Sequence, residues 1–290
     1  MRYPTVTTRL VILLGKPLGH SVSPAMHNSA FAELGMDYCY LPVEVAAEDL
    51  ATVFAGLKRM NLAGGNVTVP HKIRIIELLD RLDPRAQPIG AVNTICLEQG
   101  QAVGYNTDGY GFLRSLQEVA GISPAGERFF LLGAGGAARA IAMTLAAEGA
   151  ETIMISNRTA KRAGALAEEI NRVIRPCAAM VSAGAQEQRA ALADCTVLIN
   201  CTSLGMAPAD DTVALDPALL HPGLTVADIV YNPMRTQLLA AAEKIGCRTV
   251  PGLGMLIHQG AAAFSLWTGR EPSIATMRRA ALAQLNHATF

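Results

Sequence analysis

Short apolar runs alternate with helical patterns along most of this chain of 290 residues. Runs of β-forming residues predict strands, and apolar positions three and four residues apart predict helices. In the first part of the chain, the predicted strands are 10–14, 38–45, 62–70, 90–96 and 102–107, and the predicted helices are 23–34, 48–60, one that begins at 71, and 110–119. This alternation predicts a mostly parallel sheet that is covered by helices.

A glycine-rich turn organises the second part of the chain. An apolar run at 129–132 leads into Gly133-Ala134-Gly135-Gly136-Ala137, a helical pattern continues to Gly149, and a second apolar run occupies 152–156. In this order of strand, turn, helix and strand, the glycines let the backbone approach a pyrophosphate at the N-terminus of a helix. The order therefore favours a dinucleotide-binding unit over an unrelated glycine-rich turn.

Beyond this unit, the pattern predicts a helix at 160–171, strands at 196–200 and 224–229, and helices at 236–245, 255–267 and 273–284. We predict an α/β protein with two domains. Residues 1–109 would form a first domain with a mostly parallel sheet, which leaves it to bind a substrate, and 110–250 a Rossmann-type domain that binds the dinucleotide. Residues 251–290 contain no further strand, so we expect these C-terminal helices to return to the first domain.

The residues after the run at 152–156 indicate which dinucleotide binds. An NAD site usually has Asp or Glu here, which binds the ribose 2′-hydroxyl. This chain has Asn157-Arg158-Thr159, with Lys161 and Arg162 close behind. A charge-assisted hydrogen bond contributes roughly 1.5–3 kcal/mol, and about 1.4 kcal/mol is tenfold in affinity. Two such bonds to a 2′-phosphate would select NADP, although Lys161 and Arg162 could also be ordinary solvated charges.

The composition opposes several other classes of protein. The formal net charge is zero and no basic run occurs, so we expect no nucleic-acid partner. We find neither a secretory signal nor an apolar stretch long enough to span a membrane. The six cysteines lack Cys-x-x-Cys spacing, and we interpret them as reduced, buried residues of a cytoplasmic protein. The histidines are not at metal-ligand spacing, and no metal is assigned.

Four polar clusters lie near the ends of the predicted strands in the first part of the chain. They are Ser21 with Ser23; Asn66 and Thr68 with Lys72; Asn93; and Asn106-Thr107-Asp108. In an open α/β sheet the ligand cleft lies outside the carboxyl ends of the strands, so we expect these clusters to converge. Lys72 and Asp108 are both ionised by default at neutral pH. A lysine ammonium can protonate an oxygen that gains negative charge as a hydride reaches its carbon, so we interpret this pair as a proton-transfer dyad.

Each of these residues also has a purely structural interpretation. Ser23 could be the N-cap of the helix that starts at Pro24. Lys72 could be an ordinary surface lysine, Asp108 could cap the next helix, and Asn93 could satisfy the backbone of a turn. Their joint occurrence at the ends of successive strands, next to a dinucleotide-binding unit, favours a functional site.

Several segments of the chain resemble signatures of the shikimate dehydrogenase family. They are Gly15-Lys16-Pro17-Leu18-Gly19-His20-Ser21-Val22-Ser23-Pro24-Ala25-Met26-His27-Asn28, Asn66-Val67-Thr68-Val69-Pro70-His71-Lys72, Ala91-Val92-Asn93-Thr94, Gly104-Tyr105-Asn106-Thr107-Asp108-Gly109, Gly133-Ala134-Gly135-Gly136-Ala137, Asn157-Arg158-Thr159, and Gly252-Leu253-Gly254-Met255-Leu256 with Gln259. The family catalyses the NADP-linked interconversion of 3-dehydroshikimate and shikimate, on the route to aromatic amino acids.

The resemblance implies a role for each matching residue of the substrate site. The hydroxyl groups of Ser21 and Ser23 would bind the substrate carboxylate, and Thr68, Asn93 and Gln259 would bind ring hydroxyls. The dyad named above would be catalytic. The resemblance also implies a small-molecule substrate and a hinged cleft between two domains, and it leaves monomer and homodimer open.

For the cofactor, the resemblance implies a pocket for the adenosine phosphate and contacts near the nicotinamide. Tyr231 would line the cleft next to the substrate. The implied cofactor-binding residues are Gly133, Ala134, Gly135, Gly136, Ala137, Asn157, Arg158, Thr159, Arg162, Gly252 and Met255.

Other functions on the same fold are the alternatives. Small residues at positions 23 or 68 would suggest quinate, but Ser23 and Thr68 keep both hydroxyls, so shikimate is preferred and quinate is a possible side substrate. The lack of an acid after Ile155 opposes a quinate/shikimate dehydrogenase that uses NAD. An intact Lys72 and Asp108 oppose a non-catalytic ligand sensor. The motif formed by residues 21–23 opposes a folate dehydrogenase.

Overall fold

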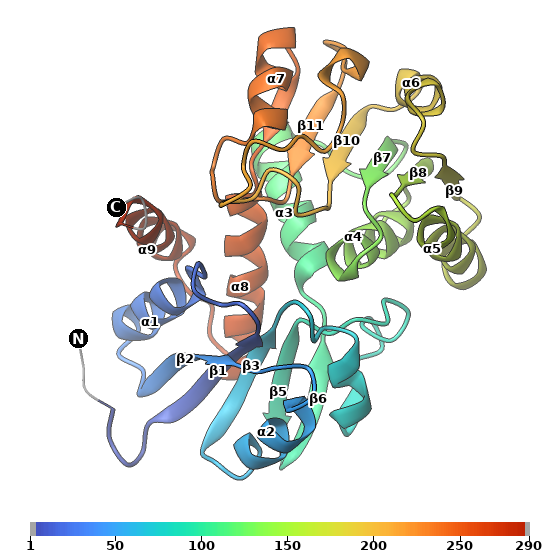
Figure 1. Cartoon of the computed structure of the whole chain (residues 1–290). Coiled ribbons are helices and arrows are strands. Elements are labelled where there is room, and N and C mark those ends of the chain that lie inside the picture. Colours follow the sequence, from blue (N-terminus) through green and yellow to red (C-terminus); the bar gives the residue numbers. More distant parts are fainter. Residues whose placement is uncertain (1–3, 288–290) are drawn as a thin grey trace. The chain divides into compact units, whose positions relative to one another are not determined.

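The computed structural model describes residues 4–287, which form two compact units. Unit 1 contains the described residues up to Thr107 and those from Ile257 onward, and unit 2 spans Asp108–Leu256. Each unit is built on its own six-stranded sheet with helices packed against it (Figure 1). The predicted fold class, a two-domain α/β protein, is confirmed.

Unit 1 has a mixed sheet with the strand order β2-β1-β3-β5-β6-β4. Its strands are β1 (Arg9–Gly15), β2 (Tyr38–Glu44), β3 (Leu62–Val67), β4 (Arg81–Leu82), β5 (Thr94–Glu98) and β6 (Gln101–Tyr105). Its helical segments are α1 (Ser23–Glu33), α2 (Leu50–Leu57), the 3₁₀ helix η1 (Arg74–Leu78), the later part of α8 (Gly252–Thr268), and α9 (Ile274–His287). Strand β1 is parallel to β2 and β3, whereas β5 is antiparallel to both of its neighbours.

Successive side chains of each strand pack on opposite faces of this sheet. Ile12 of β1 belongs to one apolar cluster with Leu50 and Phe54 of α2. On the other face, Tyr40 of β2 lies close to aromatic residues of α1 and α8, including Trp267. Helix α9 packs beside α1 (Figure 1). The C-terminal helices therefore return to the first unit, as predicted.

Unit 2 has a fully parallel sheet with the strand order β12-β11-β10-β7-β8-β9. Its strands are β7 (Arg128–Leu132), β8 (Thr152–Ser156), β9 (Ala178–Val181), β10 (Val197–Asn200), β11 (Thr225–Asp228) and β12 (Arg248–Val250). Its helices are α3 (Asp108–Ala120), α4 (Gly136–Ala147), α5 (Ala160–Val173), α6 (Ala185–Ala193), the 3₁₀ helix η2 (Pro217–Leu219), α7 (Gln237–Ile245), and the start of α8. Counted from β7 the order is 3-2-1-4-5-6, the arrangement of dinucleotide-binding sheets, and the order reverses between β7 and β10.

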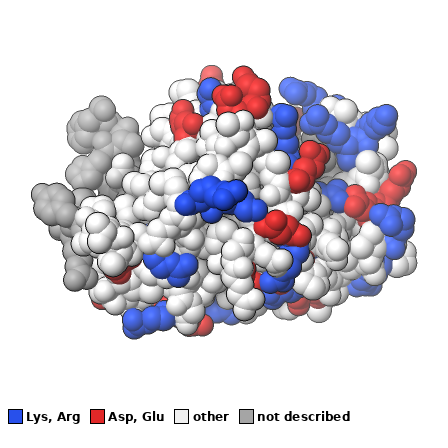
Figure 2. Space-filling view, turned by 90° about the horizontal axis from the view of Figure 1, so that it is seen from below, with Lys and Arg blue, Asp and Glu red and all other residues white. Residues whose placement is uncertain are grey.

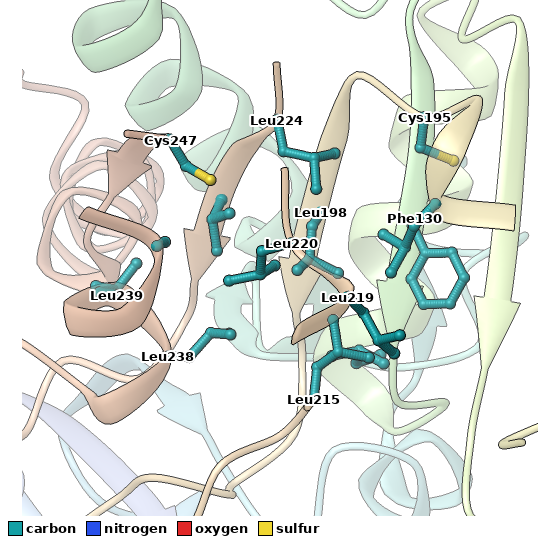
Figure 3. Packing of buried hydrophobic residues seen from close by; sticks show 14 residues of the cluster. Phe130, Cys195, Leu198, Leu215, Leu219, Leu220, Leu224, Leu238, Leu239 and Cys247 are labelled. Carbon is teal, nitrogen blue, oxygen red and sulfur yellow. The ribbon is translucent and has the colours of Figure 1, made fainter. Parts of the chain in front are cut away.

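A leucine-rich cluster fixes one face of the parallel sheet. Phe130 of β7 and Leu198 of β10 are fully buried, and they pack with Leu219 and with Leu238 of α7 (Figure 3). Burial of each such side chain stabilises the unit by roughly 1.5–3 kcal/mol relative to exposure. The cluster therefore holds β7 and β10 firmly, and with them the turns that follow these strands.

The structure corrects the predictions for several elements. The segment from His71 forms only a short 3₁₀ helix that begins at Arg74, because the backbone N–H of His71 closes a turn onto the carbonyl of Thr68 at 2.8 Å. The second strand of the β5–β6 hairpin, predicted at 102–107, spans Gln101–Tyr105, and the first begins at Thr94 rather than at 90. Strands β4, β9 and β12 and helix α6 were not predicted. They bury few residues (Leu192 alone in α6), so their hydrophobic pattern is weak.

Surface charge is mixed. On the face drawn in Figure 2, basic and acidic side chains lie among larger areas without formal charge. Within residues 4–287, no helix is both long and apolar enough to cross a membrane. All six cysteines are free thiols, and five of them are buried.

Candidate active site

The polar clusters of unit 1 gather at one edge of its mixed sheet. Strands β1, β3 and β6 run in one direction and β5 runs in the other. The carboxyl ends of β1, β3 and β6 therefore lie at the same edge as the amino end of β5. Thr68 directly follows β3 and Thr107 follows β6, whereas Asn93 precedes β5. Asn93 falls within the predicted strand 90–96 but in fact precedes β5, and this antiparallel strand still brings it to the predicted edge.

Asn93 is the centre of a buried hydrogen-bond cluster in unit 1. Its Oδ1 accepts from the backbone N–H of Thr107 at 2.8 Å and from the hydroxyl of Thr94 at 3.0 Å. Its Nδ2 donates to Oγ1 of Thr107 at 2.9 Å and to Oε1 of Gln259 at 3.1 Å. A backbone N–H can only donate, so these contacts define which way the amide faces. Two predicted site residues 166 positions apart, Asn93 and Gln259, are thus brought together.

Ser21 and Ser23 lie at the start of α1. The helix begins at Ser23 itself and no side chain caps it, so the interpretation of Ser23 as an N-cap was wrong. The Oγ of Ser21 accepts instead from the backbone N–H of Ser23 at 3.3 Å. The preceding loop is fixed because the backbone N–H of Leu18 donates to Glu44 at 2.6 Å. An uncapped helix N-terminus with two hydroxyl groups suits a carboxylate ligand.

The loop that carries Lys72 is held by backbone hydrogen bonds on both sides. The N–H of Thr68 donates to the carbonyl of Leu14 at 2.8 Å, and the carbonyl of Lys72 accepts from the N–H of Val92 at 2.7 Å. His71 is fully buried, and its Nε2 lies 2.8 Å from the carbonyl of Val45, so this nitrogen carries the proton. His71 therefore packs the loop, and Lys72 is half-buried.

Asp108, the other member of the predicted dyad, is the first residue of α3 in unit 2 and is 4% exposed. The helix therefore begins two residues before the predicted start at 110. A carboxylate in the first turn is favoured by the helix dipole.

In unit 2, the glycine-rich turn lies where the order of the strands reverses. Gly133 has φ = +108°, and a Cβ atom there would lie 3.1 Å from the carbonyl oxygen of Cys201, which follows β10. Gly135 is the N-cap of α4 and offers no side-chain cap, and a Cβ built on it would meet nothing within 4 Å. Ala138 of α4 is fully buried. Exposed N–H groups next to open space fit a pyrophosphate.

The start of α5 has the charge pattern of an anion site. Its N-cap, Thr159, makes no side-chain cap, and the first turn contains no acidic residue. Arg158, Lys161 and Arg162 are all exposed there. Cations are unfavourable near the positive end of a helix, and a bound anion would compensate for them. The side chain of Asn157 holds the turn by donating to the carbonyl of Thr159 at 3.1 Å.

A buried carboxylate shapes the loop that carries Tyr231. Asp228, at the end of β11, accepts from Nδ2 of Asn200 at 3.0 Å, from the N–H of Val230 at 3.0 Å and from the hydroxyl of Thr236 at 2.7 Å. Burial raises the pKa of Asp228, and these three donors act against that rise. Burial also raises the pKa of the half-buried Tyr231 phenol, which keeps it protonated at neutral pH. Asp228 was not predicted to belong to the site, although an acidic residue at the end of an apolar run could have indicated it.

Gly252 and Met255 lie at the start of α8. A Cβ atom on Gly252 would lie 2.4 Å from the carbonyl oxygen of Ile229, so a close backbone approach already explains this glycine. Met255 is buried, with 8% of its surface exposed.

A doubly wound sheet with a glycine-rich turn at its switch point, in a chain whose other unit carries a buried polar cluster, defines a protein of the dinucleotide-dependent dehydrogenase class. Three regions of the chain match known families. Residues 13–95 match "Shikimate dehydrogenase substrate binding domain", 116–205 match "Shikimate / quinate 5-dehydrogenase", and 252–282 match "Shikimate 5'-dehydrogenase C-terminal domain".

Individual proteins resemble the chain over nearly its whole length. It is 50% identical over 273 residues to the shikimate dehydrogenase (NADP(+)) of Moorella thermoacetica, which covers 94% of this chain and 92% of that protein. A crystal structure of a shikimate dehydrogenase in complex with NADP+ has a TM-score of 0.91 at 40% identity and 98% coverage of both chains. Shikimate 5-dehydrogenase from Listeria monocytogenes, in complex with shikimate and NAD, has a TM-score of 0.89 at 39% identity and covers 96% and 98% of the two chains. The chain belongs to the shikimate dehydrogenase family.

Proposed function

We propose that this protein is a shikimate dehydrogenase that catalyses the reversible NADPH-dependent reduction of 3-dehydroshikimate to shikimate, in the biosynthesis of aromatic amino acids. One observation carries the proposal. The hydroxyl and amide cluster around Asn93, Thr107 and Gln259 lies at the same sheet edge as Thr68, in a chain half identical to a relative named as an NADP(+) shikimate dehydrogenase.

The residues of unit 1 bind the substrate. Its carboxylate is bound by the hydroxyl groups of Ser21 and Ser23, where the uncapped N-terminus of α1 adds a favourable dipole. Its ring hydroxyls are bound by Thr68, Asn93 and Gln259. These roles are supported by the burial of Ser23, Asn93 and Gln259, because a hydrogen bond to a ligand is electrostatically stronger in a buried site than in water.

Lys72, together with Asp108, moves the proton. In the direction of reduction, the ammonium group of Lys72 donates a proton to the carbonyl oxygen as that oxygen becomes an alcohol. In the direction of oxidation, the same nitrogen accepts the hydroxyl proton. The two residues are assigned to this transfer only as a dyad.

The residues of unit 2 fit NADP, which supplies or accepts the hydride when bound. The turn at residues 133–137 provides space and uncapped N–H groups for the pyrophosphate. Asn157, Arg158, Thr159 and Arg162 surround the uncapped start of α5, and they bind the 2′-phosphate. Tyr231 and Met255 orient the substrate and the nicotinamide, and Gly252 lets the backbone approach the cofactor. We further propose that the protein acts in the cytoplasm as a monomer or homodimer.

A four-way oxidation assay tests the proposal: shikimate or quinate, each with NADP⁺ or NAD⁺. Dominant activity with shikimate and NADP⁺ is the expected result. Comparable rates with quinate or NAD⁺ would indicate an enzyme of relaxed specificity and would contradict the role given to Arg158. Absence of activity in all four mixtures would overturn the proposal in favour of another substrate or a non-catalytic sensor.

A further inference from the structure

A buried chain of hydrogen bonds in unit 1 leads from Tyr40 to the amides at the sheet edge. Tyr40 lies on β2 with 1% of its surface exposed, and its ring stacks on that of His27 with centroids 4.5 Å apart. Its hydroxyl donates to Oδ1 of Asn66 on β3 at 2.8 Å. Asn66 belongs to one of the polar clusters evident in the sequence, but the proposed function gives neither residue a role.

The first links of this chain have a defined direction. Nδ2 of Asn66 donates to the carbonyl oxygen of Asn93 at 3.1 Å, and a carbonyl can only accept, so Oδ1 of Asn66 must face Tyr40. The same Nδ2 donates to Oγ1 of Thr94 at 3.2 Å. The hydroxyl of Thr94 in turn donates to Oδ1 of Asn93 at 3.0 Å, and it lies 3.3 Å from the hydroxyl of Thr107.

The last links transmit this direction to the substrate-binding amides. With Oδ1 of Asn93 accepting from Thr94 and from the backbone of Thr107, Nδ2 of Asn93 must face Oε1 of Gln259 at 3.1 Å. Each of these hydrogen bonds therefore points in the same direction, from Tyr40 on β2 toward Gln259 on α8. Buried polar groups that are fully satisfied in this way specify a single arrangement.

We propose that Tyr40 is a positioning residue for the substrate: through Asn66 and Thr94 it adds to the backbone contact of Thr107 in holding one side of the Asn93 and Gln259 amides toward the ring hydroxyls. The inference rests on the proposed function, which has these amides bind the substrate. A site built to hydrogen-bond a hydroxyl group rejects an analogue that lacks it, because its own polar groups are then left unpaired. If the side-chain amide of Asn93 or Gln259 can rotate by 180°, its donor and acceptor exchange places. The site then no longer distinguishes the substrate from an analogue that lacks a hydroxyl group.

Three variants and one matched control test the proposal. Tyr40→Phe removes the first donor with almost no change of volume, Thr94→Val removes the middle hydroxyl, and Thr94→Ser retains it. The control is Tyr38→Phe, on the same strand, whose hydroxyl accepts from Arg9 at 3.0 Å. Tyr40→Phe and Thr94→Val should each raise the KM for shikimate about three- to tenfold, the factor produced by loss of one neutral hydrogen bond. The KM for NADP⁺ should not change, and Thr94→Ser and Tyr38→Phe should resemble the wild type.

A second readout separates positioning from general damage to the fold. The preference for shikimate over an analogue with one ring hydroxyl replaced by hydrogen, measured as the ratio of kcat/KM values, should fall severalfold in Tyr40→Phe. An equal loss of kcat/KM with both compounds would overturn the proposal. Should Tyr40→Phe fail to fold, equal ratios in Thr94→Val and Thr94→Ser would overturn it as well. A wild-type protein inactive with shikimate would overturn both proposals, whereas an active wild type with unchanged ratios in the variants would overturn this one alone.

Discussion

Lowering the pH from about 7.5 to about 5 should destabilise unit 1 through His27 of α1. The His27 side chain is fully buried, and its ring lies parallel to Tyr40 and close to Trp267, with centroids 5.2 Å apart in the latter pair. Within the described part of the chain, neither ring nitrogen has a hydrogen-bond partner. A protonated ring would place an unsolvated charge in this aromatic cluster, so burial lowers the pKa of His27 to about 3.

The size of the effect follows from the difference between the folded and unfolded pKa values. An unfolded histidine titrates near 6.5, so the unfolded chain takes up the proton first as the pH falls. The contribution of neutral His27 to the free energy of unfolding is complete above about pH 6.5. It is lost progressively as the pH falls to about 3. At about pH 5, some 1.5 units below the unfolded pKa, the loss is roughly 2 kcal/mol, or about thirtyfold in the unfolding equilibrium constant.

Urea unfolding at the two pH values measures this loss. Trp267 is the single tryptophan of the chain and lies in unit 1, so its fluorescence reports on the unit that contains His27. The matched variant is His27→Phe, which keeps an aromatic ring in the cluster and cannot titrate. Because every other group titrates in both proteins, the difference between their pH dependences isolates His27. Equal pH dependence in the two proteins would refute the reasoning and would mean that the imidazole is protonated as readily in the folded state as in the unfolded state.

Three further variants test the proposed site. Lys72→Ala should lower kcat by about 10²–10⁴-fold with an unchanged Tm, because the proton donor is lost; a near-normal kcat would remove Lys72 from the mechanism. Arg158→Ala should raise the KM for NADP about tenfold or more and leave that for NAD unchanged. Arg172→Ala, in the last turn of α5, is the control, and equal effects on both cofactors would indicate a structural role. Gly133→Ala should cost about 1–3 kcal/mol in urea unfolding because of its positive φ, and an unchanged urea midpoint would contradict this explanation.

The sequence predicts those parts of the fold in which burial is strong. Strand β7 buries four successive residues, and its apolar run stands directly before the glycine-rich turn, so both were recognisable. Strand β9 exposes Met180 and is only four residues long, and α6 buries little apart from Leu192. An edge strand or surface helix of this kind is stabilised by tertiary contacts that leave little periodicity in the chain.

The candidate site was predictable only as far as its residues stand in recognisable segments. Asn93 and Gln259 were found as separate residues, but their hydrogen bond depends on how the chain folds between them. Nothing in the sequence indicated a role for Tyr40, because its hydroxyl group on β2 donates to Asn66 on another strand, β3. The N-cap interpretation of Ser23 was wrong because a favourable Ser-Pro sequence fixes the start of a helix only to within a residue or so.

The N-termini of three helices lack the groups that usually stabilise a helix start. Helices α1, α4 and α5 have neither a side-chain cap nor an acidic residue at the N-cap or in the first turn. In contrast, α7 is capped by Thr236, α6 has Glu187 in its first turn, and α2 follows Asp49. A missing cap costs roughly 0.5–2 kcal/mol. Helices α1, α4 and α5 are those to which the proposed function assigns the substrate carboxylate, the pyrophosphate and the 2′-phosphate. These three N-termini therefore lack a stabilising interaction that a bound anion can supply. Ligand binding should stabilise the two units separately: shikimate should stabilise unit 1, and NADP should stabilise unit 2.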